Sequence, residues 1–288
     1  MPEQVDREIR PLLTQWTMAL AMLLLCLCLS PSASAEPFYT FGVVPQQSAS
    51  KLARQWAPVF RFISERSGIK LRFATAPSIP VFEARMRNGL YDFAYMNPYH
   101  YTVFNSAPGY VAFAKQRDKR IVGLMVVAAD SPYTSMSDLR NNKLAFPSPM
   151  AFAASLLPRA YLSQQKIPFT ARYVNSHDSV YRAVAQGLYP AGGGIERTLN
   201  SVDPEVRKRL RVLWRSAPFT PHAFAAHPRV PPEVVAAVRE AMIAMGDDLE
   251  GRKLLAPLRF KGIDAARDQE WDDVRTYGMD LLEKLVGG

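Results

Sequence analysis

The sequence alternates strand-like and helix-like segments over most of its length, and this alternation limits the fold more than any other feature. Residues 38–44 form an apolar run typical of a buried strand, and residues 51–66 place their apolar side chains on one helical face. Residues 70–75 then read as a strand, 80–88 as a short helix and 91–96 as a further strand. This βαβαβ order predicts an α/β fold with a mostly parallel sheet flanked by helices.

The alternation restarts near residue 121, which predicts a second lobe of the same construction. The expected strands are 121–129, 143–146, 171–174 and 211–214, and the expected helices are 149–165 and 178–186, with two tail helices at 232–247 and 269–285. No Gly- or Ser-rich linker separates the two sets, so we expect crossing strands at 121–129 and 219–226 to join the lobes. On this interpretation residues 36–125 and 221–288 form the first lobe and residues 126–220 the second.

The N-terminal segment has the pattern of an export signal. Residues 17–29 are apolar but too short to span a bilayer comfortably, and a small-x-small pattern ends at Ala35. We expect a signal peptide over 1–35, cleavage after Ala35 and a periplasmic location. An uncleaved membrane anchor is the alternative. Both cysteines, Cys26 and Cys28, lie in the apolar run, so the mature chain would contain no thiol.

Composition and motifs favour a binding protein over an enzyme. The chain has 35 basic and 26 acidic residues, and its net charge of +9 suits a small anionic ligand. We expect no nucleic-acid partner. There is no Gly-x-Ser-x-Gly, His-Glu-x-x-His or cysteine nucleophile, so no catalytic residue is predicted. The four histidines match no standard metal-ligand spacing, so we expect no metal and no cofactor, and metal binding stays a weaker alternative.

The loops that follow the predicted strands carry the candidate ligand-binding residues. In α/β architectures ligands bind outside the carboxyl ends of the strands, and helix N-termini at that edge attract anions. A Gly run at 191–194 is expected to form a turn into a helix near Glu196. The candidates in or beside these loops are Gln46, Ser48, His100, Tyr101, Ser148, Ser176, His177, Gly193, Gly194, Glu196, Arg197 and His222. The alternative for many of them is ordinary helix capping, turn formation or core packing.

Several motifs resemble, in order, those of the phosphate/phosphite/phosphonate-binding proteins of ABC importers (the PhnD-like family). They are Phe41-Gly42-Val43-Val44-Pro45, Asp92 through Asn97-Pro98 to Tyr101, Ser137-Asp138-Leu139, Ser176-His177-Asp178 and Val212-Leu213-Trp214-Arg215-Ser216. The resemblance implies a type II periplasmic-binding-protein fold with a hinged cleft. It also implies an ABC permease as partner, and we expect a monomer. Tyr101 and His177 would be the main side-chain donors to the ligand.

One segment departs from that family's pattern. Where the family has a Ser-Thr-Ser-Gly run at a helix start, this chain has Ala151, Phe152, Ala153 and Ala154. Each lost charge-assisted hydrogen bond would cost about 1.5–3 kcal/mol, so ordinary phosphonates are expected to bind poorly. A less hydrated sulfur oxyanion could rest on Phe152. This variant also resembles the periplasmic input regions of tetrathionate-type sensor kinases, so the alternative role is a free-standing sensor that docks on a membrane kinase.

Overall fold

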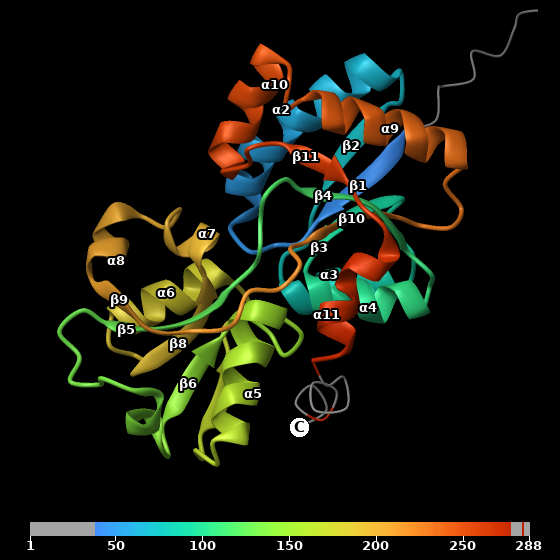
Figure 1. Ribbon diagram of the computed structural model, residues 1–288. Coiled ribbons are helices and arrows are strands. Elements are labelled where there is room, and N and C mark those ends of the chain that lie inside the picture. The colour runs from blue at the N-terminus through green and yellow to red at the C-terminus, as the bar shows by residue number, and fades with distance from the viewer. Residues whose placement is uncertain (1–37, 278–283, 285–288) are drawn as a thin grey trace, which may run out of the picture. The chain divides into compact units, whose positions relative to one another are not determined.

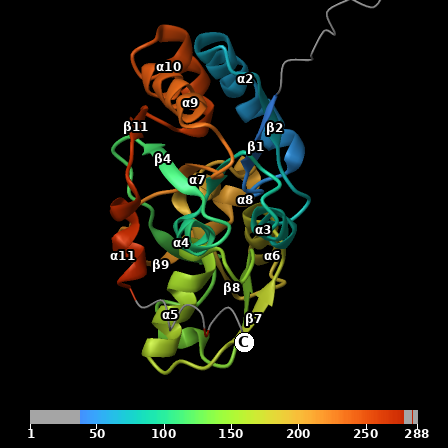
Figure 2. The ribbon, with the colours of Figure 1, turned by 90° about the vertical axis from the view of Figure 1, so that its right-hand side faces the viewer.

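The computed structural model describes residues 38–277 and residue 284, and it contains two β-sheets with helices on both faces of each (Figures 1 and 2). The expected signal peptide and its cleavage site lie outside these residues. The first sheet consists of β1 (Tyr39–Val43), β2 (Leu71–Ala74), β3 (Phe93–Met96), β4 (Val111–Gln116), β10 (Ala223–Ala226) and β11 (Ile263–Ala265). The helices around it are α2 (Ala49–Ser67), α3 (Ile79–Arg87), α4 (Pro98–Ser106), α9 (Pro232–Ala244), α10 (Leu249–Leu255), η3 (Ala256–Leu258), η4 (Asp268–Trp271) and α11 (Asp272–Arg275).

The second sheet is built from the middle of the chain. Its strands are β5 (Gly123–Ala128), β6 (Lys143–Phe146), β7 (Thr170–Tyr173), β8 (Ala191–Ile195) and β9 (Leu210–Arg215). Its helices are η1 (Met136–Leu139), the π-helical turn η2 (Phe152–Leu156), α5 (Leu157–Gln164), α6 (His177–Ala185), α7 (Glu196–Leu199) and α8 (Pro204–Lys208). Because η2 runs directly into α5, residues 152–164 form one continuous helical segment.

Strand directions confirm the expected α/β class. In the order β11-β4-β10-β3-β1-β2, only β10 and β11 oppose the other described strands of the first sheet. In the order β7-β6-β8-β5-β9, β5 alone opposes the other described strands of the second. Both sheets are therefore mostly parallel, and two of the reversed strands, β5 and β10, are the first strands after the chain changes sheet.

The chain crosses between the sheets twice, and the crossings touch. Ile121 lies in the connection from β4 to β5, and Phe219 lies in the connection from β9 to β10. The two residues form an isolated antiparallel bridge. Both connecting segments can be followed in Figure 1. Since β5 lies wholly in the second sheet, the chain leaves the first sheet before residue 123, earlier than the boundary at 125–126 that the sequence suggested. Residues 121–129 and 219–226 are likewise not strands that span both lobes.

Side-chain alternation along β5 explains why helices cover both faces of the second sheet. Leu124 and Val126 pack into one apolar cluster with Val180 and Tyr181 of α6, whereas Met125 and Val127 pack into another on the opposite face. In the first sheet, α2 and α9 pack together on one side, while α3, α4 and α11 lie on the other (Figure 1). Both sheets thus have two buried faces, which leaves the strand ends for binding.

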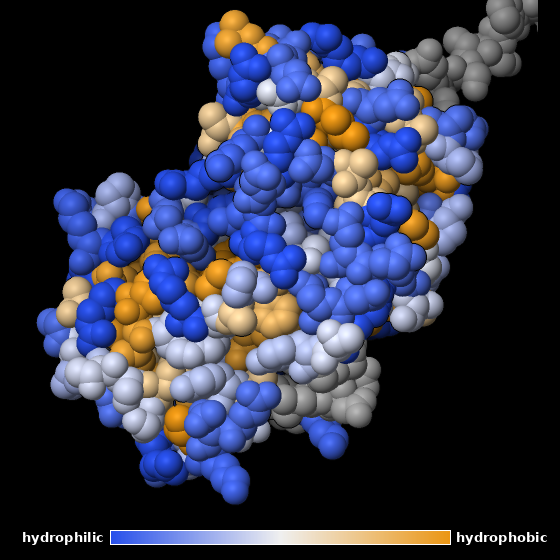
Figure 3. Space-filling view, viewed as in Figure 1, coloured by the Kyte–Doolittle hydropathy of each residue, from blue (hydrophilic) through white to orange (hydrophobic). Residues whose placement is uncertain are grey.

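The outer surface is mostly hydrophilic on the face shown in Figure 3, with apolar residues in small groups. The most exposed large apolar side chains are Leu188, Leu249, Leu90 and Val111, and they come from different parts of the chain. No helix within the described residues has the length and apolarity needed to cross a membrane.

Candidate functional site

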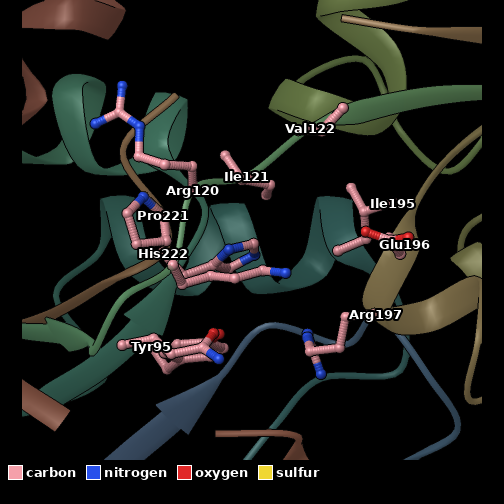
Figure 4. A pocket seen from close by; sticks show the side chains of 11 residues that line it. Tyr95, Arg120, Ile121, Val122, Ile195, Glu196, Arg197, Pro221 and His222 are labelled. Carbon is pink, nitrogen blue, oxygen red and sulfur yellow. The ribbon is translucent and has the colours of Figure 1, made fainter. Parts of the chain in front are cut away.

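Two adjoining cavities lie where the two lobes meet. The smaller has an empty volume of about 250 Å³ and is lined by Val44, Gln46, Ile79, Asn97, Ile121, Ala151, Phe152, Ala153, Ala154, His177, Ile195 and His222. The larger has an empty volume of about 400 Å³ and is lined by Tyr95, Gln116, Lys119, Arg120, Ile121, Val122, Ile195, Glu196, Arg197, Pro221 and His222 (Figure 4). Ile121, Ile195 and His222 line both, so the two cavities share a wall.

The start of the helical segment 152–164 faces the smaller cavity with unpaired donors. Within the described chain, no acceptor binds the backbone N–H groups of Phe152, Ala153 and Ala154, whereas Ser155 and Leu156 both donate to the carbonyl of Ala151. These three are the N–H groups that a helix start leaves unsatisfied, and the helix dipole adds partial positive charge there. All four residues 151–154 line the smaller cavity. The arrangement is therefore a backbone cradle for negative charge.

Glycines in two strands allow this helix start to lie against the sheet. A Cβ on Gly123 of β5 would come 2.2 Å from the carbonyl oxygen of Ala153, and one on Gly193 of β8 would come 1.8 Å from that of Ala154. On the other face of β8, a Cβ on Gly194 would come 2.3 Å from the hydroxyl oxygen of Tyr181. The glycine run is therefore a strand that admits close helices on both faces, and the expected glycine turn is wrong.

His177 adds an imidazole to the same cavity from the first residue of α6. Its side chain is 2 % exposed, and its Nδ1 lies 3.1 Å from the hydroxyl oxygen of Thr198, which leaves Nε2 without a partner among the described residues. Burial, together with the nearby Arg197 guanidinium, lowers the pKa of His177 to about 3. The ring is therefore neutral at physiological pH, and its free nitrogen is available to a ligand.

The low pKa also makes the folded protein sensitive to acid. In the unfolded chain the imidazole has its ordinary pKa of about 6.5, whereas in the folded protein it stays neutral down to about pH 3. As the pH drops from 6.5 towards 3, the unfolded chain takes up a proton that the folded protein does not, so the free energy of unfolding falls by about 1.4 kcal/mol per pH unit. Acid therefore destabilises the fold, which urea unfolding of the ligand-free protein at several pH values measures.

Gln46, Arg197 and His222 meet at the wall between the cavities. The Arg197 guanidinium donates to Gln46 Oε1, and Gln46 Nε2 lies 3.0 Å from His222 Nε2. The His222 ring stacks on Tyr95 with ring centroids 5.0 Å apart. Because Gln46 belongs to the first lobe and Arg197 to the second, their contact joins the lobes. Asn97 Nδ2 makes another such contact, 3.1 Å from the carbonyl oxygen of Met150.

A family model described as "ABC transporter, phosphonate, periplasmic substrate-binding protein" matches residues 41–271. The chain belongs to this family of periplasmic phosphonate-binding proteins. It is 22% identical over 239 residues to the phosphate-import protein PhnD of Mycolicibacterium smegmatis, which corresponds to 71% of each chain. The family consists of transporter substrate-binding proteins that act in the periplasm with an ABC permease.

Solved structures show the same fold. A binding-protein component of an ABC phosphonate transporter from Pseudomonas aeruginosa matches with a TM-score of 0.78 at 18% identity, over 87% of each chain. PhnD1 of Prochlorococcus marinus, in complex with methylphosphonate, matches with a TM-score of 0.76 at 15% identity, over 85% of this chain and 98% of that one. The expected type II periplasmic-binding fold is thus confirmed.

Six of the residues proposed from the sequence line the cavities of this phosphonate-binding family member. They are Gln46, Phe152, His177, Glu196, Arg197 and His222. Sequence analysis missed Tyr95, Asn97, Ile195, Lys119 and Arg120 as lining residues. Asn97 carried a usable signal, because the Asn-Pro pair that ends a strand also begins a helix. Lys119 and Arg120 precede β5 in a connection whose path the local sequence does not specify.

The other proposed residues have structural partners away from both cavities. His100 Nε2 lies 2.9 Å from Glu83 Oε1, and Ser148 Oγ lies 3.4 Å from the same oxygen. Ser176 caps α6 by accepting from the N–H of Ser179, and Ser48 is exposed. Gly193 and Gly194 lie within β8, as described above. Among the described residues, no cluster of three or more His, Cys, Asp or Glu side chains could hold a metal ion.

Tyr101 is the clearest correction. It lies one helical turn into α4, fully buried, and its hydroxyl donates to Asp268 Oδ1 at 2.5 Å while accepting from the N–H of Ala112 at 3.2 Å. Its ring packs on Trp271 with centroids 4.7 Å apart. These contacts fasten the C-terminal part of the chain to the first lobe, so Tyr101 supports the fold and does not reach the cavities.

Replacing Tyr101 by Phe should therefore lower stability and leave binding unchanged. The substitution removes the bond to Asp268 and leaves the N–H of Ala112 without its acceptor, so we expect the free energy of unfolding to fall by about 1–3 kcal/mol. Urea unfolding measures the first effect, and calorimetric titration with methylphosphonate measures the second. A large loss of affinity without loss of stability would return Tyr101 to the binding site.

Proposed function

We propose that this protein captures a small oxyanion in the smaller cavity and delivers it, chemically unchanged, to an ABC permease. One observation carries the proposal: the three unpaired N–H groups of residues 152–154 and the imidazoles of His177 and His222 line one cavity. Backbone N–H groups at a helix start and the N–H group of a neutral imidazole are hydrogen-bond donors suited to oxyanion oxygens. His177 Nε2 is such a donor in the tautomer whose Nδ1 accepts from the Thr198 hydroxyl. Membership of the phosphonate-binding family supports the same class of ligand.

The lining of the smaller cavity supports binding without catalysis. None of its lining residues carries a hydroxyl, thiol or carboxyl group, so neither histidine has a nucleophile or a carboxylic acid to act on within the described cavity. Gln46 and Thr198 hold one nitrogen of each histidine in a hydrogen bond. A ligand recovered after incubation should therefore be unaltered.

The charge of the site favours a weakly hydrated oxyanion over inorganic phosphate. Ala151–Ala154 supply no hydroxyl donors, and Arg197, whose charge lowers the pKa of both histidines, already donates to Gln46. Removing a highly charged anion from water is costly when few opposite charges compensate it.

A panel of anions tests this proposal. Phosphate, phosphite, methylphosphonate, sulfate, thiosulfate and tetrathionate are to be compared by thermal shift and then by isothermal titration calorimetry. The absence of hydroxyls at residues 151–154 predicts weak phosphonate binding, but the unpaired N–H groups and the two imidazoles offer replacement donors. We therefore expect methylphosphonate or one of the sulfur oxyanions to stabilise the protein more than inorganic phosphate does. Tightest binding of phosphate would show that backbone N–H groups compensate a highly charged anion without hydroxyl donors. Absence of binding by all six would refute the proposed ligand class.

A further inference from the structure

Three side chains form a hydrogen-bonded chain that ends at the ligand cavities. Arg197 of α7 donates to Gln46 Oε1, and Gln46 Nε2 lies 3.0 Å from His222 Nε2. Gln46 is 4 % exposed and His222 is 3 % exposed, so both side chains are buried. Arg197 belongs to the second lobe, Gln46 lies in the loop after β1, and His222 is the residue before β10.

The donor and acceptor roles in this chain follow from Arg197. A guanidinium group can only donate, so the amide atom of Gln46 that faces it must be the oxygen. The other amide atom is then the NH₂ group, which can also only donate. His222 Nε2 must therefore accept, and an acceptor nitrogen carries no proton. In a neutral imidazole the single ring proton then lies on Nδ1.

The surroundings of His222 keep the ring neutral. Burial is the largest cause, and Arg197, His177 and His100 add to it, so that the pKa of His222 lies well below its ordinary value. The other ionisable groups around the ring are Tyr95, which stacks on it, and Lys119, Arg120 and Glu196 along the larger cavity. Protonation would also place an Nε2–H group against the NH₂ group of Gln46. Positive charge on His222 is disfavoured on both counts.

The remaining nitrogen of His222 is free. No partner for Nδ1 occurs among the described residues, and the side chain lines both cavities. Figure 4 shows His222, Tyr95 and Arg197 around the larger cavity. The proton on Nδ1 therefore has no acceptor in the protein, which leaves it to a ligand.

We propose that Gln46, oriented by Arg197, is a positioning residue that fixes His222 as the neutral Nδ1–H tautomer and so makes it a hydrogen-bond donor to the ligand. The tautomer follows from the protein alone, and its use by an oxyanion rests on the proposed function. This tautomer makes the site selective for ligands, because an Nδ1–H group can donate a hydrogen bond but cannot accept one. A ligand that presents an oxygen acceptor to His222 is bound, and one that presents an N–H or O–H donor at that point is rejected.

The ligand-free tautomer gives the direct test. Long-range ¹H–¹⁵N correlation spectra of the wild-type protein with ¹⁵N-labelled histidine should show His222 protonated on Nδ1 and unprotonated on Nε2 from pH 8 to pH 6, with assignment from His222→Gln. A spectrum with the proton on Nε2, or an equal mixture of tautomers, would overturn the proposal. This measurement needs no ligand, so it separates the proposal from the identity of the bound anion.

The substitution Gln46→Glu should reverse the roles in the chain. A carboxylate accepts from both Arg197 and His222, so His222 Nε2 must become a donor, and at pH 8 Nδ1 becomes an acceptor that faces the anion. Methylphosphonate affinity should then fall about 10- to 100-fold relative to wild type at pH 8. At pH 6 the ring can be protonated on both nitrogens beside the new carboxylate, so the deficit should shrink several-fold.

Gln116→Glu is the matched control. It adds the same negative charge to the larger cavity, where Gln116 donates to the carbonyl of Arg259 and does not contact His222. We expect it to leave the His222 tautomer unchanged. Methylphosphonate carries more negative charge at pH 8 than at pH 6, so the loss of affinity in this control should also shrink at pH 6, but by less than in Gln46→Glu. The same losses in both variants at both pH values would refute the positioning role. Failure of methylphosphonate to bind wild type, with the Nδ1–H tautomer present, would count against the proposed ligand and support the assignment of His222.

Discussion

Replacing Gly193 by Ala is expected to destabilise the protein and to abolish most of its ligand affinity. The new Cβ would come 1.8 Å from the carbonyl oxygen of Ala154 and 2.8 Å from a ring carbon of Phe146. The nearer atom belongs to the backbone of a buried helical segment, so no side-chain rotation relieves the contact. Overpacking of this kind costs about 3 kcal/mol or more. At about 2–4 °C per kcal/mol, thermal unfolding should shift down by about 6–12 °C.

Binding should fall with stability, since the helix start that must move carries the unpaired N–H groups of residues 152–154. Methylphosphonate affinity in Gly193→Ala should drop at least about tenfold, as for the loss of one hydrogen bond to an anion. Gly187→Ala is the matched control, because Gly187 has φ +74° but open space around its Cβ position. It carries backbone strain of about 1–2 kcal/mol without the clash and should bind normally. Similar losses of methylphosphonate affinity in both variants would contradict the role assigned to the helix start at residues 152–154.

Replacing His177 by Ala should produce the opposite pattern, with a large loss of affinity and a small loss of stability. The imidazole offers one free nitrogen to the cavity, and removing a hydrogen bond to a buried anion costs about 1.5–3 kcal/mol, or roughly ten- to a hundredfold in affinity. The remaining partners of Thr198 are unaffected, because its hydroxyl still contacts Tyr181 and the carbonyl of Ile195. Calorimetric titration and urea unfolding of the same preparation measure both quantities.

Tyr101→Phe provides the comparison for this variant, since it removes a buried hydroxyl that lies outside both cavities. We expect His177→Ala to lower affinity and Tyr101→Phe to lower stability. If His177→Ala retained full affinity for every anion that binds the wild-type protein, the smaller cavity would not be the ligand site.

The fold was predictable because it follows from local periodicity. Apolar runs such as 38–44 and amphipathic stretches such as 51–66 appear in the structure as β1 and α2 with only small shifts at their ends. The strand β4 was missed, although its partners Ala225 and Ala226 lay in a segment that had been recognised. Its residues Val111–Gln116 include Lys115 and Gln116, and this mixture gives a weaker strand signal than the neighbouring apolar runs.

The site was only partly predictable, for reasons of helical phase and chain path. Gln46 and His177 sit directly after strands, where the topology itself places them at the cleft. Tyr101 also follows a strand, but α4 begins at Pro98, and three residues along that helix the side chain points to Trp271. Because most residues of α4 are buried, its sequence has no clear polar face from which the rotation of the helix could be predicted. The glycine run was misread because the need for close approach arises from tertiary packing against α6 and against η2, and η2 is remote in sequence.

The order of strands in the first sheet has a consequence for how the chain acquires its structure. β10 lies between β3 and β4, and β11 lies at the edge beside β4, yet both come from residues after 222. The second sheet, in contrast, uses only the continuous stretch from Gly123 to Arg215. As the chain emerges from its N-terminus onward, this stretch can complete its own sheet while β3 and β4 still await the strand that belongs between them. The first sheet therefore closes last, over an already folded neighbour, and until then the edges of β3 and β4 stay open to pairing with other chains.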